Sequence, residues 1–325
     1  MIHFQEISQQ QFLCEYWQKK PLLIKQALPN FITPLVADEL AGLALEEEFE
    51  SRLITGSIQS QDWSLRTGPF NECDFANLPE KDWTLLVQGV DRHIDDIHSL
   101  IQHFDFIPHW RFDDVMISYA ATGGSVGPHF DYYDVFLLQG SGKRRWQLSS
   151  KNCEMDNYLD NAPLRIMSEF IPEQTFDVEP GDVLYIPPKV AHHGVSLDDN
   201  CTTLSFGYRA YSAKEMYDFI EKPCPTKLEN TYYQDPQWQE NQDPAFIPNS
   251  AIKQAQKILD ISDDEFARFV TTPDTNDVKI LQDFEYENPN SSLVMHPASK
   301  FAKIKRAAPS LKEKCYLNGE VRIAD

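Results

Sequence analysis

The run Gly127-Pro128-His129-Phe130-Asp131 lies within residues 111–209, where short apolar segments alternate with Gly, Pro and Asp. This pattern predicts strands at 115–119, 134–139, 144–148, 183–186 and 202–208. Many short strands at such spacing favour a β-sandwich or barrel. The glycine-rich approach to the run, residues 123–127, lets the backbone pass close to a bound ligand.

The sequence contains three His-x-Asp triplets, at 93–95, 103–105 and 129–131. Residues i and i+2 share a face on a strand but not on a helix. The first two triplets fall in and at the end of residues 83–104, where apolar residues recur every three or four positions and predict one amphipathic helix. Only the third triplet lies in the β-rich region, so it is the candidate for chemistry.

A third ligand is expected from a later strand. The spacing of Gly181, Pro187 and His192 resembles the second cupin motif, in which a histidine follows five residues after the proline. His193 is the alternative ligand, since it is adjacent in the chain. Lys189 stands where cupins often have glycine, so the loop is expected to differ locally.

His129, Asp131 and His192 together make two imidazoles and one carboxylate. On one face of a sheet this set leaves open positions on a metal, as in the facial triad of non-haem Fe(II) oxygenases. The competing interpretation is a hydrogen-bonded His/Asp pair in a β core with an unrelated loop histidine.

The strand predicted at 144–148 carries a basic pair. By alternation Arg144 shares a face with Trp146 and Leu148, whereas Arg145 points the other way. A buried arginine needs an anionic partner, and the distal carboxylate of a dicarboxylate cosubstrate would provide one. Arg145 is instead expected on a solvated edge, which is also the competing interpretation for Arg144.

Composition narrows the class of protein. The 325 residues carry a formal net charge of −21, are 42% hydrophobic and suffice for about two domains. No apolar run approaches the ~20 residues of a membrane span, no secretory signal is visible, and the six cysteines form no CxxC pair. We therefore expect a cytoplasmic protein without a zinc ribbon, whose acidity favours a basic partner and leaves nucleic-acid contact secondary at most.

Outside the β-rich region the pattern is mainly helical. Helices are predicted from Ser8 and over 34–48, 213–222 and 250–270. Asn318-Gly319 is typical of a type I′ hairpin turn.

Residues 106–209 resemble the JmjC/cupin-type ribosomal oxygenases. The runs that carry the resemblance are 107–111, 114–118, 127–146 and 179–188, with 16–24 and 83–88 outside the block. The bacterial branch, arginine hydroxylases acting on large-subunit ribosomal protein L16, is the more similar. That branch places an arginine fifteen residues after the first metal histidine, as Arg144 follows His129 here, but it commonly has an acidic residue where His193 stands.

The resemblance implies an α+β protein of three parts. These are a double-stranded β-helix (cupin/jelly-roll) catalytic domain over 1–210, a helical dimerisation segment over 211–265, and a partial winged-helix-like region over 266–325. A homodimer follows from the second part.

The resemblance also implies an Fe(II)- and 2-oxoglutarate-dependent dioxygenase that uses O₂ to hydroxylate an arginine β-carbon of a basic ribosomal protein. His129, Asp131 and His192 would hold the metal, and Arg144 would bind 2-oxoglutarate with a hydroxyl from Ser205 or Ser118. Candidates for binding the target guanidinium are Tyr132, Tyr133 and Asp134. Two alternatives stay open: the same chemistry on a histidine or asparagine of another target, and a non-catalytic metal-binding cupin.

Overall fold

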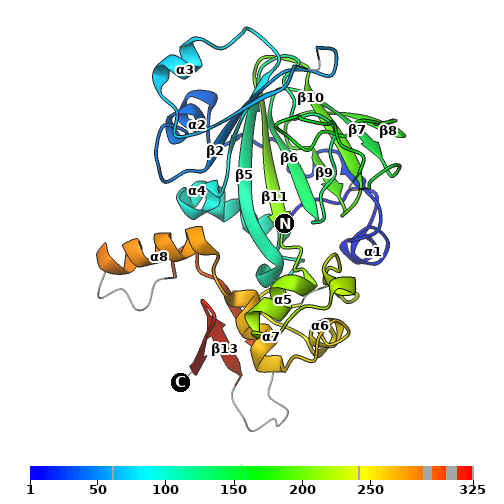
Figure 1. The fold of residues 1–325 in the computed structure, drawn as a ribbon, viewed down its shortest axis with the longest axis vertical. Helices are drawn as coiled ribbons and strands as arrows, with labels where there is room; N and C mark the ends of the chain where they lie inside the picture. The colour runs from blue at the N-terminus through cyan, green and yellow to red at the C-terminus, as the bar shows by residue number, and fades with distance from the viewer. Residues whose placement is uncertain (61, 155, 241, 288–294, 305–312, 324–325) are drawn as a thin grey trace. The chain divides into compact units, whose positions relative to one another are not determined.

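The computed structural model describes every residue except 61, 155, 241, 288–294, 305–312 and 324–325. Its internal contacts divide the chain into two compact units (Figure 1). The first unit comprises Met1–Leu100 and Asp113–Tyr208, and the second comprises Ile101–Phe112 and Arg209–Asp325.

The first unit is built on two sheets. The strands of the larger sheet are β1 Leu22–Ile24, β2 Ser51–Thr55, β3 Ser64–Thr67, β4 Trp83–Val87, β5 Phe112–Ala120, β6 Val135–Ser141, β9 Val183–Ile186 and β11 Cys201–Tyr208. Their spatial order is β1-β9-β6-β11-β5-β4-β2-β3. The smaller sheet has the order β10-β7-β8, from Ala191–Ser196, Arg144–Ser149 and Gln174–Val178, and its pairings are antiparallel.

A shared apolar core joins the two sheets. It combines side chains of the larger sheet with side chains of the smaller one: Val135, Leu137, Leu184, Ile186, Trp146, Leu148 and Val178. On β7, Arg144 and Trp146 are buried while Arg145 is exposed, as alternation predicted. The antiparallel, two-sheet β core agrees with the predicted cupin-type fold.

Short helices accompany these sheets. They are α1 Gln9–Glu15, α2 Ala37–Leu43, α3 Glu72–Ala76, the 3₁₀ turn η1 Val90–Arg92 and α4 Asp95–Ser99. The first begins as predicted, because the Ser8 hydroxyl caps it by accepting from the Gln11 backbone N–H at 3.0 Å. The helix predicted over 34–48 is real but shorter.

The single helix predicted over residues 83–104 is wrong. Residues 83–87 form β4, which pairs with β2 on one side and β5 on the other and is therefore largely buried. The chain then turns at Gly89, whose φ of +62° favours glycine, and continues through η1, α4 and the 3₁₀ turn η2 Leu100–Phe104. The apolar spacing of three and four arose from several short elements in succession.

The second unit combines helices with a small sheet. Its elements are η3 His109–Arg111, α5 Ala213–Phe219, η4 Thr226–Leu228, α6 Asn249–Ala255, α7 Asp263–Thr271, α8 Thr275–Glu287, β12 Phe301–Ile304, β13 Lys314–Leu317 and β14 Glu320–Ile323. The strands pair antiparallel in the order β12-β13-β14, and α7 contacts all three.

Two local predictions for this unit have different outcomes. The helix expected over 250–270 is interrupted, because Ser262 starts a new helix through a capping box with Glu265. The hairpin at Asn318-Gly319 is confirmed, with φ values of +50° and +78°.

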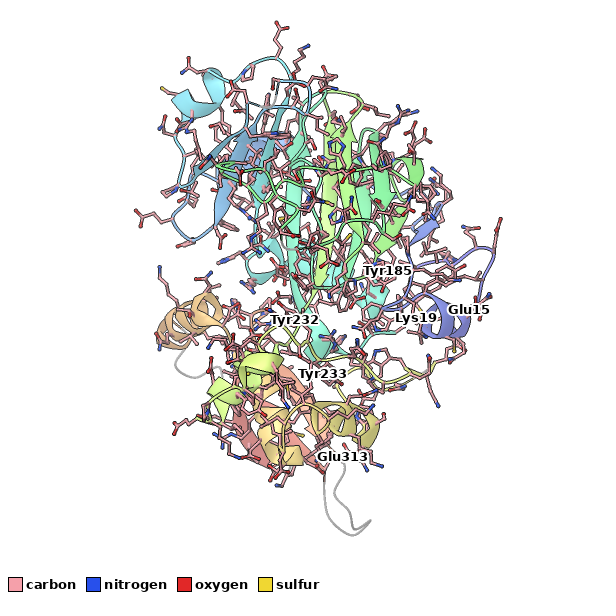
Figure 2. All side chains as sticks on the ribbon, turned by 45° about the vertical axis from the view of Figure 1, so that its right-hand side comes forward. Glu15, Lys19, Tyr185, Tyr232, Tyr233 and Glu313 are labelled. Carbon is pink, nitrogen blue, oxygen red and sulfur yellow. The ribbon has the colours of Figure 1, made fainter. Side chains whose placement is uncertain are left out.

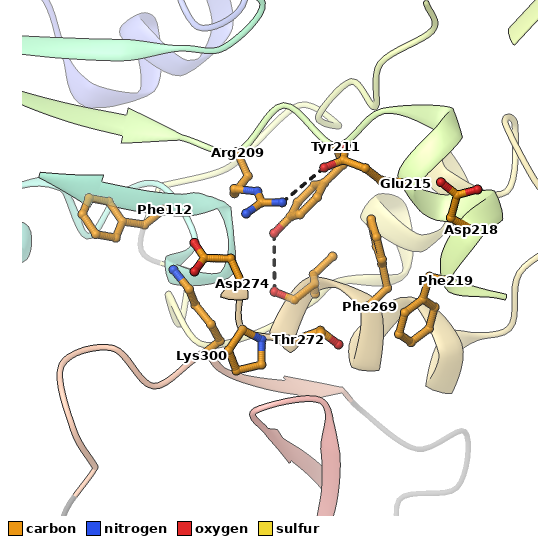
Figure 3. Close-up of a pocket in the computed structure, with 12 residues that line it drawn as sticks. Phe112, Arg209, Tyr211, Glu215, Asp218, Phe219, Phe269, Thr272, Asp274 and Lys300 are labelled. Atoms are coloured by element: carbon orange, nitrogen blue, oxygen red, sulfur yellow. Dashed lines mark hydrogen bonds and ion pairs between the residues drawn. The ribbon is translucent and has the colours of Figure 1, made fainter. Parts of the chain in front are cut away.

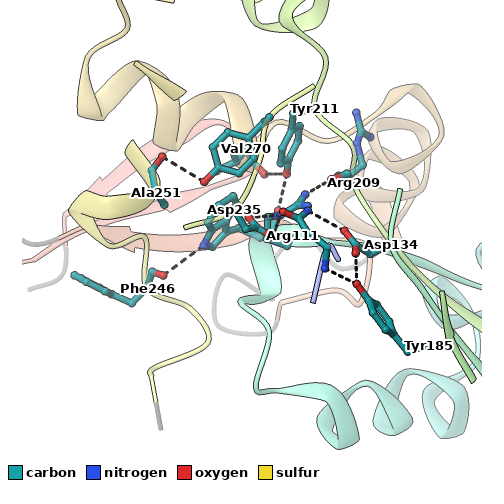
Figure 4. A network of polar contacts seen from close by, with 12 residues as sticks. Arg111, Asp134, Tyr185, Arg209, Tyr211, Asp235, Phe246, Ala251 and Val270 are labelled. Atoms are coloured by element: carbon teal, nitrogen blue, oxygen red, sulfur yellow. Dashed lines mark hydrogen bonds and ion pairs between the residues drawn. The ribbon is translucent and has the colours of Figure 1, made fainter. Parts of the chain in front are cut away.

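Buried aromatic rings form the core of the second unit, and Trp110 lies against several of them: Tyr211, Tyr233, Trp238 and Phe266. The Tyr233 hydroxyl donates to the Ala251 carbonyl at 3.3 Å (Figure 2 marks Tyr233). Among these rings the buried Arg111 forms an ion pair with Asp235, both side chains being only 1% exposed (Figure 4).

A hollow of about 310 Å³ opens in the second unit beside Tyr211 and Phe269 (Figure 3). Its lining carries charges of both signs. Arg209 Nη2 lies 3.3 Å from Glu215 Oε1, and Lys300 lies near Asp274. This mixture favours neither an anion nor a cation. No described helix is both long and apolar enough to cross a bilayer.

Candidate metal and cosubstrate site

Two backbone hydrogen bonds bring the candidate metal ligands together. The His129 N–H donates to the His192 carbonyl at 3.1 Å, and the His192 N–H donates to the His129 carbonyl at 2.7 Å. This bridge ties the segment after β5 to β10 and places the two imidazole rings 4.2 Å apart. Asp131, two residues beyond His129, reaches the same place: its Oδ2 lies 3.8 Å from His129 Nε2 and 3.7 Å from His192 Nε2.

The three side chains present a converging set of ligand atoms, all within 4.8 Å of one another. The Nδ1 atom of His129 lies 3.0 Å from the Gly127 carbonyl, and that of His192 lies 3.1 Å from the Val190 carbonyl. A carbonyl only accepts, so each Nδ1 carries the proton and each Nε2 keeps its lone pair. This arrangement orients both imidazoles as metal ligands commonly are. Two nitrogens and one carboxylate fit Fe(II) and leave positions open for a cosubstrate.

The electrostatics of His192 favour metal binding. Burial lowers its pKa to about 4. The ring is therefore neutral at ordinary pH, which is the form that binds a metal.

His193 lies on the opposite face of β10. Its backbone pairs with Gln147 of β7, and its Nδ1 lies 3.4 Å from the Gln147 side-chain oxygen. The ring packs edge-on against Phe170, and burial lowers its pKa to about 4. Because successive residues of a strand face opposite ways, only His192 joins His129 and Asp131.

The loop before β10 turns at Lys189, where cupins often have glycine. That residue adopts φ +60°, the left-handed conformation that glycine tolerates best. Its backbone N–H donates to the Asp131 carbonyl at 2.7 Å. Lysine therefore adopts a glycine-type backbone conformation here, and the loop supports a metal-ligand residue.

Arg144 lies on the same inner face of the smaller sheet as His192, since Ser196 pairs with Arg144 and His192 with Leu148. Its side chain is 4% exposed, and its Nε donates to the Cys201 thiol at 3.3 Å. This Arg144 side chain has a buried Nη2 that finds no hydrogen-bond partner among the residues that the structure describes.

Within the described part of the chain, Trp146 carries a second buried donor without a partner, its indole Nε1. The ring lies between two site residues, with its centroid 5.6 Å from the Arg144 guanidinium carbon and 5.9 Å from the His192 ring centroid. Buried donors are costly unless an acceptor reaches them. A dianionic cosubstrate supplies such acceptors, so these groups fit 2-oxoglutarate.

The two predicted serines are both buried. The Ser118 hydroxyl on β5 donates to the Thr203 carbonyl at 3.5 Å. Ser205 on β11 pairs with Leu137, a residue of the core that also contains Trp146, so Ser205 faces the space between the sheets.

One of the three candidates for binding a target guanidinium is wrongly placed for that role. Asp134 is 1% exposed and accepts from the Tyr185 hydroxyl at 2.5 Å and from the Gln18 amide at 2.9 Å (Figure 4). It is therefore a structural residue. Tyr133 is 41% exposed, and the charge of Asp131 holds its pKa well above the usual range, so the phenol stays a donor.

The sequence motifs did not identify two groups at this site, the Trp146 N–H and the Cys201 thiol. The sequence predicted part of the role of the Trp146 N–H, because strand alternation already put the ring on the face of Arg144. Cys201 had none, since it lies 57 residues from Arg144 and meets it only through tertiary folding.

Comparison with known sequences supports the same class of site. A family model described as the JmjC domain matches residues 99–216. The chain is 39% identical over 252 residues, 77% of its length, to the ribosomal protein uL16 3-hydroxylase of Escherichia coli. It is 41% identical over 221 residues, 67% of its length, to a probable ribosomal oxygenase of Haemophilus influenzae. These alignments span 66% and 54% of the two relatives.

Solved structures give the same picture. All of this chain superposes on 87% of YcfD, a ribosomal oxygenase from Escherichia coli, with a TM-score of 0.67 and 30% identity. The structure of YcfD in complex with cobalt and 2-oxoglutarate matches 98% of this chain and 86% of that chain, again with a TM-score of 0.67 and 30% identity.

Proposed function

Because this chain belongs to the ribosomal oxygenase family of JmjC-domain proteins, we propose that it is an Fe(II)- and 2-oxoglutarate-dependent dioxygenase. Its substrate is ribosomal protein uL16, in which it hydroxylates an arginine β-carbon. The observation that carries the proposal is the His129–Asp131–His192 cluster beside a buried, incompletely bonded arginine.

Each site residue then has a defined role. His129, Asp131 and His192 hold Fe(II), and Arg144 binds the distal carboxylate of 2-oxoglutarate with help from Ser205 or Ser118. When bound, the metal and cosubstrate supply the oxidation: O₂ and 2-oxoglutarate become succinate, CO₂ and one oxygen inserted into the target C–H bond. The protein orients these groups, and the core between the sheets excludes water.

The choice of substrate rests on the named relative and on charge. A net charge of −21 favours encounter with a basic ribosomal protein, and the association rate should fall as salt rises.

The architecture of the whole chain is part of the proposal. The catalytic domain comprises 1–210, residues 211–265 form a helical dimerisation segment, and 266–325 form a winged-helix-like region in a cytoplasmic homodimer. The small antiparallel sheet packed on α7 is consistent with the last module.

The test is mass spectrometry of uL16 after incubation with the protein, Fe(II), 2-oxoglutarate and air, alongside the Asp131→Ala variant. We expect one added oxygen on an arginine, and none with the variant. Oxygen on a histidine or asparagine, or 2-oxoglutarate turnover stimulated only by other ribosomal proteins, would keep the chemistry and change the target. Metal binding without any turnover would support a non-catalytic cupin.

A further inference from the structure

We propose that Cys201 is a positioning residue, which orients the Arg144 guanidinium toward the distal carboxylate of 2-oxoglutarate. This inference rests on the proposed function and assigns a role to a residue outside the metal triad and the cosubstrate-binding motif.

The Cys201 sulfur lies where two donors meet. It accepts from Arg144 Nε at 3.3 Å and from Gln139 Nε2 at 3.4 Å, and the residue is fully buried. Gln139 is itself fixed, because its oxygen accepts from the Thr203 hydroxyl at 3.1 Å and its nitrogen also donates to the Ser141 carbonyl at 2.7 Å. The sulfur is therefore part of a rigid polar cluster between β6 and β11.

This contact fixes the direction of the guanidinium. The five N–H groups of arginine form a planar fork, so holding Nε fixes the plane of the whole group. With Nε engaged by sulfur, the terminal nitrogens are the part left for a carboxylate, and Nη2 is a buried donor that no described residue accepts from. The ring of Trp146 beside the guanidinium limits its movement further.

The chemistry of the thiol suits this purpose. Sulfur is a weak, uncharged acceptor, so it orients Arg144 without neutralising its charge. A carboxylate at position 201 would form an ion pair with the guanidinium and compete with the cosubstrate. A thiol therefore keeps the arginine both ordered and available.

The test uses Co(II)-loaded protein and calorimetric titration with two ligands. 2-Oxoglutarate has a distal carboxylate that reaches Arg144, whereas oxalate binds the metal and has none. For Cys201→Ala we expect 2-oxoglutarate affinity to fall about five- to tenfold, the effect of losing one ordinary hydrogen bond, because sulfur is a weak acceptor. Oxalate affinity should not change, since the metal ligands are untouched.

Two further variants make the result specific. Cys201→Ser keeps an acceptor and should restore most of the 2-oxoglutarate affinity. Cys224→Ala removes a thiol in the second unit and should leave both ligands unaffected. Oxalate binding also reports whether each variant retains a folded site.

Two results would overturn the inference. One is a Cys201→Ala variant that binds 2-oxoglutarate as tightly as the unmodified protein. The other is an equal loss for both ligands, which means general damage to the site. If the unmodified protein binds Co(II) and oxalate but not 2-oxoglutarate, the proposed function fails, and this inference fails with it.

Discussion

Arg111 and Arg144 are buried to nearly the same degree, 1% and 4% exposed, but in very different surroundings. In the second unit, Arg111 Nε donates to both oxygens of Asp235, at 2.8 and 3.0 Å, and Nη1 donates to the Arg209 carbonyl. In the first unit, Arg144 has a thiol as its hydrogen-bond acceptor, and its Nη2 has no partner among the described side chains and backbone groups.

The difference separates a structural charge from a functional one. A buried ion pair with its charge compensated is complete in the folded chain and needs nothing more. A buried cation with an unused donor is incomplete, and its fold tolerates that cost where a ligand completes it. Burial alone does not distinguish the two arginines, whereas the set of acceptors does.

Breaking the complete pair should have the largest effect on stability. Arg111→Met leaves Asp235 buried without its cation, so we expect the free energy of unfolding to fall by about 3–5 kcal/mol. Urea denaturation followed by tryptophan fluorescence measures this. The double variant Arg111→Met/Asp235→Leu should recover much of the lost stability. A double variant no more stable than Arg111→Met would contradict a purely structural role for this ion pair.

The same substitution at Arg144 should act on binding instead. Arg144→Met removes the partner of the distal carboxylate, and we expect 2-oxoglutarate affinity to fall about a hundredfold, as for a truncated charge pair. Stability should be unchanged or slightly higher, because an incompletely satisfied buried cation is lost. A variant that unfolds like Arg111→Met but binds the cosubstrate normally would reverse the comparison.

A buried carboxyl group, that of Asp114, is a third case, and it should make the stability of the fold depend on pH. Burial, and then the charge of Asp113, raises the pKa of Asp114 to about 6, although Arg92 and the Gln88 and Gly89 N–H groups oppose this. The folded state therefore holds a proton that the unfolded state releases near pH 4, and stability falls as pH rises from about 4 to 6. In Asp114→Asn, the loss of unfolding free energy between pH 4 and pH 6 should be smaller by about 1–2 kcal/mol. Unfolding curves across that range measure it, and an unchanged slope would show that Asp114 is already ionised.

The smallest effect is expected at Lys189, beside the metal ligands. Its φ of +60° is unfavourable for a side chain with a Cβ, so Lys189→Gly should stabilise the fold by about 1 kcal/mol or less, after the entropy of glycine is subtracted. The melting temperature measures this. A clear loss of stability would mean that the lysine side chain, whose Nζ lies 5.6 Å from the Tyr132 ring, contributes more than the backbone costs.

Sequence reasoning succeeded where one local pattern determines one feature. The burial of Arg144 and the exposure of Arg145 follow from strand alternation within β7. His129 and Asp131 lie in the segment between β5 and β6, where an isolated bridge from His129 to His192 brings them to the site. It failed at residues 83–104, where a buried strand and several short helical turns together imitate one helical period. It also missed β3 and β8, whose largely exposed residues carry no apolar alternation.

The remaining features depend on contacts that no local pattern encodes. The thiol of Cys201 reaches Arg144 only after β6, β7 and β11 have folded together. The complete bonding of Arg111 likewise depends on Asp235, 124 residues away.

Whether this protein hydroxylates uL16 is decided by mass spectrometry of uL16 treated with the protein, Fe(II), 2-oxoglutarate and isotopically labelled dioxygen. We expect one labelled oxygen on an arginine β-carbon, succinate formed in equal amount, and neither product with Arg144→Met at low 2-oxoglutarate. Unlabelled uL16 beside a metal-loaded protein that does not consume 2-oxoglutarate would contradict this expectation.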